Sequence, residues 1–310
     1  MLTDLSSRAL SKAGGALVEG IDASKPMDKD TANDLYDLYL RHGYLLLRDQ
    51  HLTPQQHIDF SRAFGGLDIH PIEQIRLPDY PEIIELSIRP KAEGLEKPDE
   101  IVGQIPWHSD LTYTDNPSRG AVLYAREVPE EGGETGFVDT AAAYDALDEE
   151  TKRRIDGLEM IHSGGQVTQS AVKTLEERNR ASAGDARKPD SNAKSAAPMV
   201  DTGPDTFPPV IHPLVVVHPE AGRKVLNISP AFARRILGLP EAEADNLLKK
   251  LVSHATAPER AYVHTWRVGD IVIWDNWRTM HMAAGCKAKY RRLMHRTTLS
   301  ADYQMGRIAA

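Results

Sequence analysis

The stretch at residues 105–113 reads IPWHSDLTY. It is rich in β-prone residues and carries no helix-start signal, so we expect an extended backbone here. Because alternate side chains of a strand point to the same side, His108 and Asp110 can offer an imidazole and a carboxylate to one metal ion. This pair is therefore the first candidate for a metal site.

Two other His-x-acid pairs lack this geometry. His57 and Asp59 follow the sequence TPQQ at 53–56. This capping box, with proline in the first turn, predicts a helix in which the two side chains diverge. His218 and Glu220 lie in a stretch whose proline and glycine predict a turn. Neither pair is expected to share a metal, and replacing His57 by alanine is expected to be nearly silent.

The third metal ligand is expected on a later strand. Two histidines and one carboxylate leave coordination positions open, as in the non-haem Fe(II) oxygenases. His281 follows a predicted strand at 271–274 and is the preferred candidate. His295 is a weaker alternative, because on an extended strand it faces away from Arg292 and Arg296.

Two arginines stand four residues apart on a predicted last strand at 291–299. Arg292 and Arg296 would share one face of that strand, with about 13 Å between their Cα atoms. Near a metal site they would hold two anions at different depths, since arginine suits bidentate recognition of carboxylates and sulfonates. An ordinary surface strip of ion pairs explains the same spacing equally well.

The remaining pattern predicts strands, tight turns and a few helices. Apolar periodicity predicts helices at 30–41 and 241–254. Strands are expected in a hairpin-like segment at 16–22, at 44–48, and in a hairpin that joins 211–217 to 223–228. Ser229 and Pro230 are expected to open a further helix.

The composition excludes several classes of protein. A net charge of −8 argues against a dedicated nucleic-acid binder. The longest apolar runs are too short to span a membrane, and the N-terminus lacks the apolar core of a secretory signal. The single cysteine, Cys286, excludes an internal disulfide and a cysteine-based zinc cage. We expect a cytoplasmic protein with neither a nucleic-acid nor a membrane partner.

Residues 170–206 differ from the rest of the chain. They are rich in alanine, serine, aspartate, lysine and proline and contain few large apolar residues. Such a segment cannot bury much surface, and long inserts of this kind are usually lids or linkers. No other change in composition marks a boundary. We therefore expect one domain over residues 1–310, with a lid or an inert surface loop at 170–206.

In its ordered motifs the chain resembles the family of taurine dioxygenase and 2,4-dichlorophenoxyacetate dioxygenase, which are Fe(II)/2-oxoglutarate-dependent oxygenases. The resemblance spans nearly the whole chain. In chain order, the matching motifs are GALVEGID (15–22), LLLRDQ (45–50), FGG (64–66), WHSD (107–110), LYAR (123–126), GGET (132–135), HPEAGRK (218–224), GD (269–270), WDN (274–276), His281 and RRLMHR (291–296).

The resemblance implies a mainly β fold with flanking helices, namely a double-stranded β-helix or jelly roll. It implies that Fe(II) is held by His108, Asp110 and His281. It also implies 2-oxoglutarate as cosubstrate, whose distal carboxylate Thr135 and Arg292 would bind.

The resemblance further implies that O2 is used to hydroxylate a small anionic organic substrate, and the product could then fragment at a C–O or C–S bond. Candidate substrates are aryloxyalkanoates, sulfonates, sulfate esters and carboxylates. Arg296 would face the substrate anion, with further contacts from His70, Gln104, Leu111 and Asn227. The protein is expected to be a homo-oligomer, a dimer or tetramer.

Two other functions stay open at this point. A metal-dependent hydrolase could use the same three ligands around zinc, and a non-catalytic barrel could bind a small anion. The hydrolase does not explain Thr135 together with Arg292, and an intact set of metal ligands argues against a non-catalytic barrel.

Overall fold

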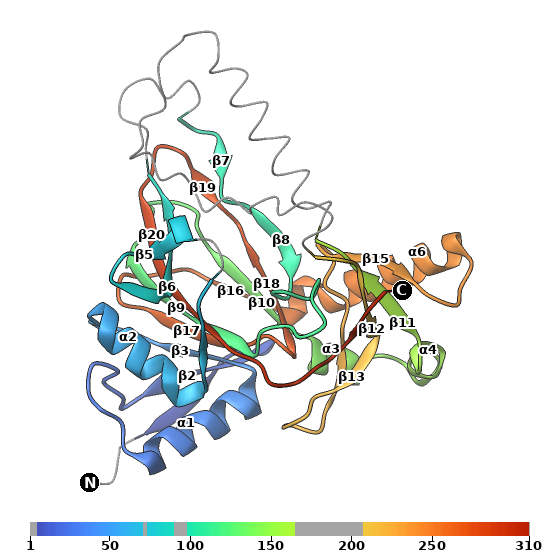
Figure 1. The fold of residues 1–310 in the computed structure, drawn as a ribbon, viewed down its shortest axis with the longest axis horizontal. Coiled ribbons are helices and arrows are strands. Elements are labelled where there is room, and N and C mark those ends of the chain that lie inside the picture. Colours follow the sequence, from blue (N-terminus) through green and yellow to red (C-terminus); the bar gives the residue numbers. More distant parts are fainter. Residues whose placement is uncertain (1–4, 71–72, 90–97, 165–206, 310) are drawn as a thin grey trace.

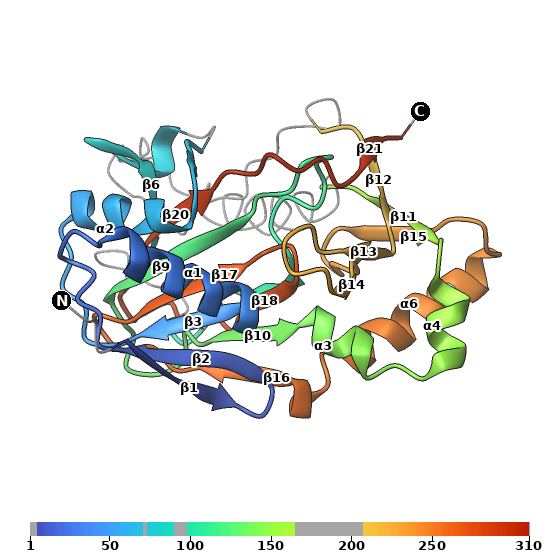
Figure 2. The same ribbon diagram turned by 90° about the horizontal axis from the view of Figure 1, so that it is seen from below.

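The computed structural model describes residues 5–70, 73–89, 98–164 and 207–309, and the expected insert at 170–206 lies outside these ranges. The protein is mainly β, with two groups of helices at opposite ends of the molecule (Figures 1 and 2). The helices are α1 (Lys29–His42) and α2 (Pro54–Ser61) at one end, and α3 (Thr140–Asp145), α4 (Glu149–Ile155) and α6 (Glu241–Ala255) toward the other. None of the described helices is long and apolar enough to cross a membrane.

The larger sheet has nine strands in the order β1-β2-β3-β17-β9-β20-β6-β5, with β4 paired to β20. The strands are β1 (Ser6–Ser11), β2 (Gly14–Glu19), β3 (Tyr44–Leu47), β4 (Leu67–Asp68), β5 (Arg76–Leu77), β6 (Tyr80–Ile88), β9 (Gly120–Glu127), β17 (Ile271–Asp275) and β20 (Arg292–Leu299). Alternate residues of β17 serve opposite faces of this sheet. Ile271 and Ile273 pack in the apolar cluster that includes α1 and α2, whereas Val272 and Trp274 pack in a cluster with Phe137 of the second sheet.

The second sheet has the order β16-β10-β18-β8. Its strands are β8 (Ile105–His108), β10 (Thr135–Asp139), β16 (Ala261–His264) and β18 (Thr279–Ala283). Phe137 of β10 and Met294 of β20 belong to one buried cluster, so the two sheets face each other across a shared apolar interior. This arrangement confirms the expected jelly roll with flanking helices.

A smaller sheet and the second helical group enclose another apolar cluster. That sheet has the order β15-β11-β12-β21, and two further pairs of strands form small sheets of their own, β13 with β14 and β7 with β19. The strands are β7 (Ile101–Val102), β11 (Glu159–His162), β12 (Val210–Pro213), β13 (Val215–Val217), β14 (Lys224–Leu226), β15 (Ala233–Ile236), β19 (Cys286–Lys287) and β21 (Arg307–Ile308), and the single 3-10 turns are η1 (Arg62–Phe64), η2 (Glu73–Ile75) and η3 (Pro258–Arg260). The cluster includes Leu247 and Leu251 of α6, as the periodicity of that helix predicts.

Three expected elements differ from the structure. Ser229 and Pro230 open a turn that leads into strand β15 rather than a helix, because the Ser229 hydroxyl accepts the Ser109 N–H instead of capping a helix. The run at 211–217 is divided between β12 and β13, which pair in different sheets. Strand β20 is followed by β21, so it is not the last strand.

His57 lies in α2 as predicted, after the complete capping box, but its side chain is 0% exposed. Replacement by alanine would leave a cavity that costs on the order of 2 kcal/mol, so this change is not expected to be silent for stability. Burial, reinforced by the neighbouring His295, lowers the pKa of His57 from 6.5 to about 3.

Below pH 6.5, His57 therefore becomes protonated in the unfolded chain but stays neutral in the folded protein. Because protonation stabilises only the unfolded chain, the free energy of unfolding decreases as the pH falls from 6.5 toward 3. In His57→Leu, we expect the slope of unfolding free energy against pH to decrease by up to about 1.4 kcal/mol per pH unit between about pH 6 and pH 5. Urea unfolding at a series of pH values measures the slope. The exposed His51 supplies the control His51→Leu, and equal slopes in the two variants would contradict the prediction.

Candidate active site

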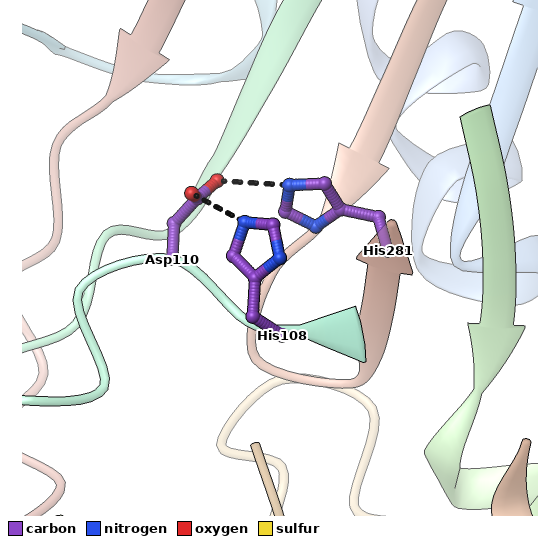
Figure 3. A group of neighbouring side chains, drawn as sticks. All are labelled: His108, Asp110 and His281. Carbon is purple, nitrogen blue, oxygen red and sulfur yellow. Dashed lines mark ion pairs between the residues drawn. The ribbon is translucent and has the colours of Figure 1, made fainter. Parts of the chain in front are cut away.

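Three metal-ligating side chains converge where β8 and β18 pair. The register places His281 of β18 opposite His108, the last residue of β8. Asp110 follows two residues later in a turn, not on the strand itself, and its carboxylate points back at both imidazoles (Figure 3). The His108 Nε2–Asp110 Oδ1 distance is 3.5 Å and the His281 Nε2–Asp110 Oδ2 distance is 3.6 Å. One ligand atom from each residue lies within 4.8 Å of the other two.

The protonation state of this group suits a cation. His108 Nδ1 lies 2.7 Å from the Pro106 carbonyl, which can only accept, so Nδ1 donates its hydrogen there and Nε2 is the nitrogen that faces the Asp110 carboxylate. Burial, with His108 close by, lowers the pKa of His281 to about 3 and keeps that ring neutral. Burial alone would raise the pKa of Asp110, but Arg296 and the two histidines outweigh it and hold the carboxyl well below its usual range.

Two imidazoles and one ionised carboxylate therefore meet, and Nε2 of each ring faces the Asp110 carboxylate. This donor set matches a divalent transition metal that keeps open coordination positions. His108, Asp110 and His281 can hold Fe(II), because the structure already supplies the three donors, their ionisation states and the hydrogen bond that orients one of them.

Arg296, on the opposite sheet, lies next to the triad of His108, Asp110 and His281. Its Nη2 donates to Asp110 Oδ2 at 2.8 Å, and its guanidinium lies 5.4 Å from the centre of the Trp274 ring. The buried Nε of Arg296 has no hydrogen-bond partner among the described residues. An arginine with a donor to spare is thus fixed beside the candidate metal site.

Arg292 lies on the same face of β20, since β20 pairs with β6 in regular alternation from Arg292 to Thr297. Within the described ranges, no hydrogen bond or ion pair reaches its guanidinium. Burial lowers the pKa of Arg292 from its ordinary value. A Cβ placed on Gly133 would lie 3.4 Å from Arg292 Cδ, so this side chain runs beside the segment that leads into Thr135. A charged group without a partner at this position is suited to an incoming carboxylate.

Thr135 is buried at the start of β10, where Trp266 Nε1 donates to its Oγ1 at 2.9 Å. An indole N–H can only donate, so the hydroxyl oxygen accepts and its own hydrogen stays available for an acceptor in the site. Thr135 shares a face of β10 with Phe137, which stands opposite His281. The register therefore places Thr135 on the side of the sheet that carries the triad.

The four residues expected at the substrate side occupy different surroundings. Leu111 follows Asp110 directly, is half-buried and has a left-handed φ of 55°. His70 is half-buried beyond β4, which pairs with β20. Gln104 is exposed in the connection between β7 and β8. The Asn227 amide donates to the Pro213 carbonyl at 3.3 Å, and no described contact joins it to the triad.

Sequence reasoning missed an aromatic group beside the triad. Tyr113 stacks edge-on against Phe232, with ring centres 4.8 Å apart, and against Phe207 at 5.2 Å. Phe232 in turn contacts the His108 ring edge-on at 6.1 Å. The position of Tyr113, three residues after Asp110 in a β-prone stretch, was the available signal. Phe207 and Phe232 come from distant segments that no local pattern connects to the site.

Comparison with known proteins agrees with this geometry. The family model described as "Taurine catabolism dioxygenase TauD, TfdA family" matches residues 6–298. A (S)-phenoxypropionate/alpha-ketoglutarate-dioxygenase of Sphingobium herbicidovorans is 35% identical over 93% of this chain and 92% of its own length. An alpha-ketoglutarate-dependent 2,4-dichlorophenoxyacetate dioxygenase of Cupriavidus pinatubonensis is 32% identical over 92% and 94%. The crystal structure of a taurine dioxygenase from Burkholderia xenovorans superposes with a TM-score of 0.75 at 28% identity, over 99% of this chain and 95% of that one.

The chain belongs to the TauD/TfdA family of dioxygenases. It is an Fe(II)-dependent dioxygenase that uses 2-oxoglutarate, also called alpha-ketoglutarate, as cosubstrate. The family sets aside the metal-dependent hydrolase and the non-catalytic barrel as alternatives.

Proposed function

We propose that this dioxygenase hydroxylates a small organic anion of the aryloxyalkanoate class, with iron held by His108, Asp110 and His281. Thr135 and Arg292 bind the distal carboxylate of 2-oxoglutarate. When bound, iron and 2-oxoglutarate supply the oxidising chemistry that consumes O2 and releases succinate and CO2.

The observation that carries the proposal is the position of Arg296. Its guanidinium reaches the Asp110 carboxylate at 2.8 Å while its buried Nε lacks a described partner. A substrate carboxylate that accepts from this side chain would bring its neighbouring carbon close to the metal. An anion bound there would also accept a hydrogen bond from the buried Nε of Arg296. The same contact would therefore contribute to the affinity for the substrate and fix its orientation.

The aromatic group favours an aryl substrate among the candidate anions. The Phe232 ring contacts both His108 and Tyr113, so a row of aromatic rings begins at the metal ligand and extends away from it. Edge-to-face contacts between aromatic rings contribute about 0.5–1.5 kcal/mol beyond their burial. The two relatives with 35% and 32% identity are named for phenoxypropionate and 2,4-dichlorophenoxyacetate, which combine an aryl ring, an ether oxygen and a carboxylate.

The choice predicts a defined product. Hydroxylation of the carbon between the ether oxygen and the carboxylate of phenoxyacetate gives a hemiacetal, which collapses to phenol and glyoxylate. Each turnover should therefore release one phenol, one glyoxylate, one succinate and one CO2.

Succinate and phenol formation with three matched compounds tests this function. Phenoxyacetate has all recognition elements, cyclohexyloxyacetate lacks the aromatic ring, and 2-phenoxyethanol lacks the anion. We expect kcat/KM to fall about tenfold without the ring and by more without the anion. Alkyl sulfates, sulfonates and short carboxylates complete the panel. Preference for one of these would contradict the aryl assignment, and equal turnover of 2-phenoxyethanol would contradict the role of Arg296.

His70, Gln104, Leu111 and Asn227 are retained in the proposal as further substrate contacts. The proposal also includes one oxygenase domain over the chain, a cytoplasmic location and a homodimer or homotetramer. The acidic composition and single buried cysteine support the location, and light scattering after size exclusion measures the oligomeric state.

A further inference from the structure

The side chain of Asn276 holds the main chain of Asp110 from both sides. Asn276 is 3% exposed and lies in the connection between β17 and β18. Its Oδ1 accepts the Asp110 N–H at 2.7 Å, and its Nδ2 donates to the Asp110 carbonyl at 2.8 Å. Because a main-chain N–H only donates and a carbonyl only accepts, these partners fix which way the amide points.

The same amide also reaches the far end of the turn that carries Asp110. Nδ2 donates to the Ser118 carbonyl at 3.0 Å. One side chain therefore joins the beginning and the end of the segment 110–118. This segment connects Asp110 to the start of strand β9.

The backbone at this turn needs such support. Strand β8 ends at His108, and Leu111 adopts a left-handed φ of 55°, which costs a non-glycine residue roughly 1 kcal/mol or more. Local preferences alone would not direct the Asp110 carboxylate toward the two histidines. The hydrogen bonds of Asn276 stabilise the turn and so offset the conformational free energy that Leu111 costs.

Asn276 is itself anchored by a buried charge cluster. The adjacent Asp275 accepts from Arg119 Nη1 at 2.5 Å, from His218 Nε2 at 3.0 Å and from the Trp277 N–H at 3.1 Å. The Asn276 N–H donates to the Arg119 carbonyl at 3.1 Å. The side-chain amide of Asn276 is therefore carried by a main-chain segment that these hydrogen bonds hold in place.

We infer that Asn276 is a positioning residue that sets the Asp110 carboxylate against His108 and His281 before a metal arrives. This inference rests on the proposed role of Asp110 as a ligand. A site arranged in advance binds its metal without paying to order the turn, so the amide should contribute to metal affinity although it touches no metal.

The variant Asn276→Ser removes the double hydrogen bond without adding charge. Mn(II) binding to the metal-free full-length protein is measured by electron paramagnetic resonance. We expect the Kd for Mn(II) to rise tenfold or more, with an altered spectrum of the bound ion. Asn116→Ser is the matched control, because Asn116 lies in the same turn, is exposed and loses only one amide donor, to the Ala301 carbonyl. Unchanged Mn(II) affinity in folded Asn276→Ser would overturn the inference.

Hydrogen exchange of the wild-type protein provides a second test that needs no variant. The peptide that covers residues 109–118 should exchange slowly in the metal-free protein, with little added protection from Mn(II). Fast exchange that is slowed only by Mn(II) would show that the metal, not Asn276, orders the turn. Asp110→Ala separates the two hypotheses: if it leaves Mn(II) binding intact, the ligand assignment fails, whereas if it abolishes binding and Asn276→Ser does not weaken it, only the positioning role fails.

Discussion

Asp110→Ala is expected to abolish substrate-dependent succinate formation and to weaken Mn(II) binding by about a hundredfold or more. Asp110 provides the only carboxylate in the group of metal-ligating side chains found within the described ranges. Its loss also removes the ion pair at 2.8 Å with Arg296, so the charge of Arg296 would remain uncompensated beside the two histidines. Both effects disfavour a divalent ion, and both succinate release and an Mn(II) titration report them.

Asp115→Ala is a suitable control for this variant. Asp115 lies in the same turn, and its main-chain carbonyl accepts from the N–H groups of Met305 and Gly306, bonds that the substitution leaves in place. The control should retain metal binding and activity. Full iron binding and turnover in Asp110→Ala would reject the assignment of His108, Asp110 and His281 as the metal ligands, since the Asp110 carboxylate would then not be needed.

Arg292→Ala is expected to raise the KM for 2-oxoglutarate at least tenfold and to leave the KM for the organic substrate nearly unchanged. Arg296→Ala should do the reverse. Truncating one partner of a buried charge pair costs about 2–5 kcal/mol, which is ample for such shifts. The proposed division is supported by the surroundings of the two side chains, since Arg296 contacts Asp110 while Arg292 runs beside Gly133, two residues before Thr135.

Arg291→Ala is the control for both arginines, because Arg291 is exposed and paired with Glu127. Steady-state kinetics with each substrate varied in turn measures the two KM values, and Mn(II) affinity shows whether Arg296→Ala also disturbs Asp110. If both variants were impaired only toward 2-oxoglutarate, the division of labour would be wrong and the substrate anion would need another partner.

The parts of the fold that depend on neighbouring residues were predictable from the sequence. Thr53 and Gln56 make the expected capping box of α2, and Gly43 ends α1 in a left-handed conformation, because each signal involves atoms within one turn. Ser229 and Pro230 carry a similar local signal, yet they begin no helix. The Ser229 hydroxyl is instead held by Ser109, which is far away in the sequence.

In the candidate site, too, contacts between residues far apart in the sequence could not be predicted. The alternation of a strand was the reason for pairing His108 with Asp110 and for preferring His281 to His295. In the structure, however, strand β8 ends at His108 and a turn carries Asp110, while the β8–β18 register sets His281 opposite His108. The supporting residues could not be predicted in this way. Asn276 and Phe232 reach the site only because separate loops come together there. Contacts between distant loops leave no periodic pattern in the sequence.

The pairing of β8 with β18 also bears on how the enzyme acquires its iron during biosynthesis. His281 and Asn276 are synthesised at least 166 residues after Asp110. A nascent chain that ends before β18 therefore offers only His108 and Asp110, without the third donor and without the strand that pairs with β8. Iron loading is therefore expected to follow closure of the second sheet, because the three donors meet only after β18 has been synthesised and has paired with β8.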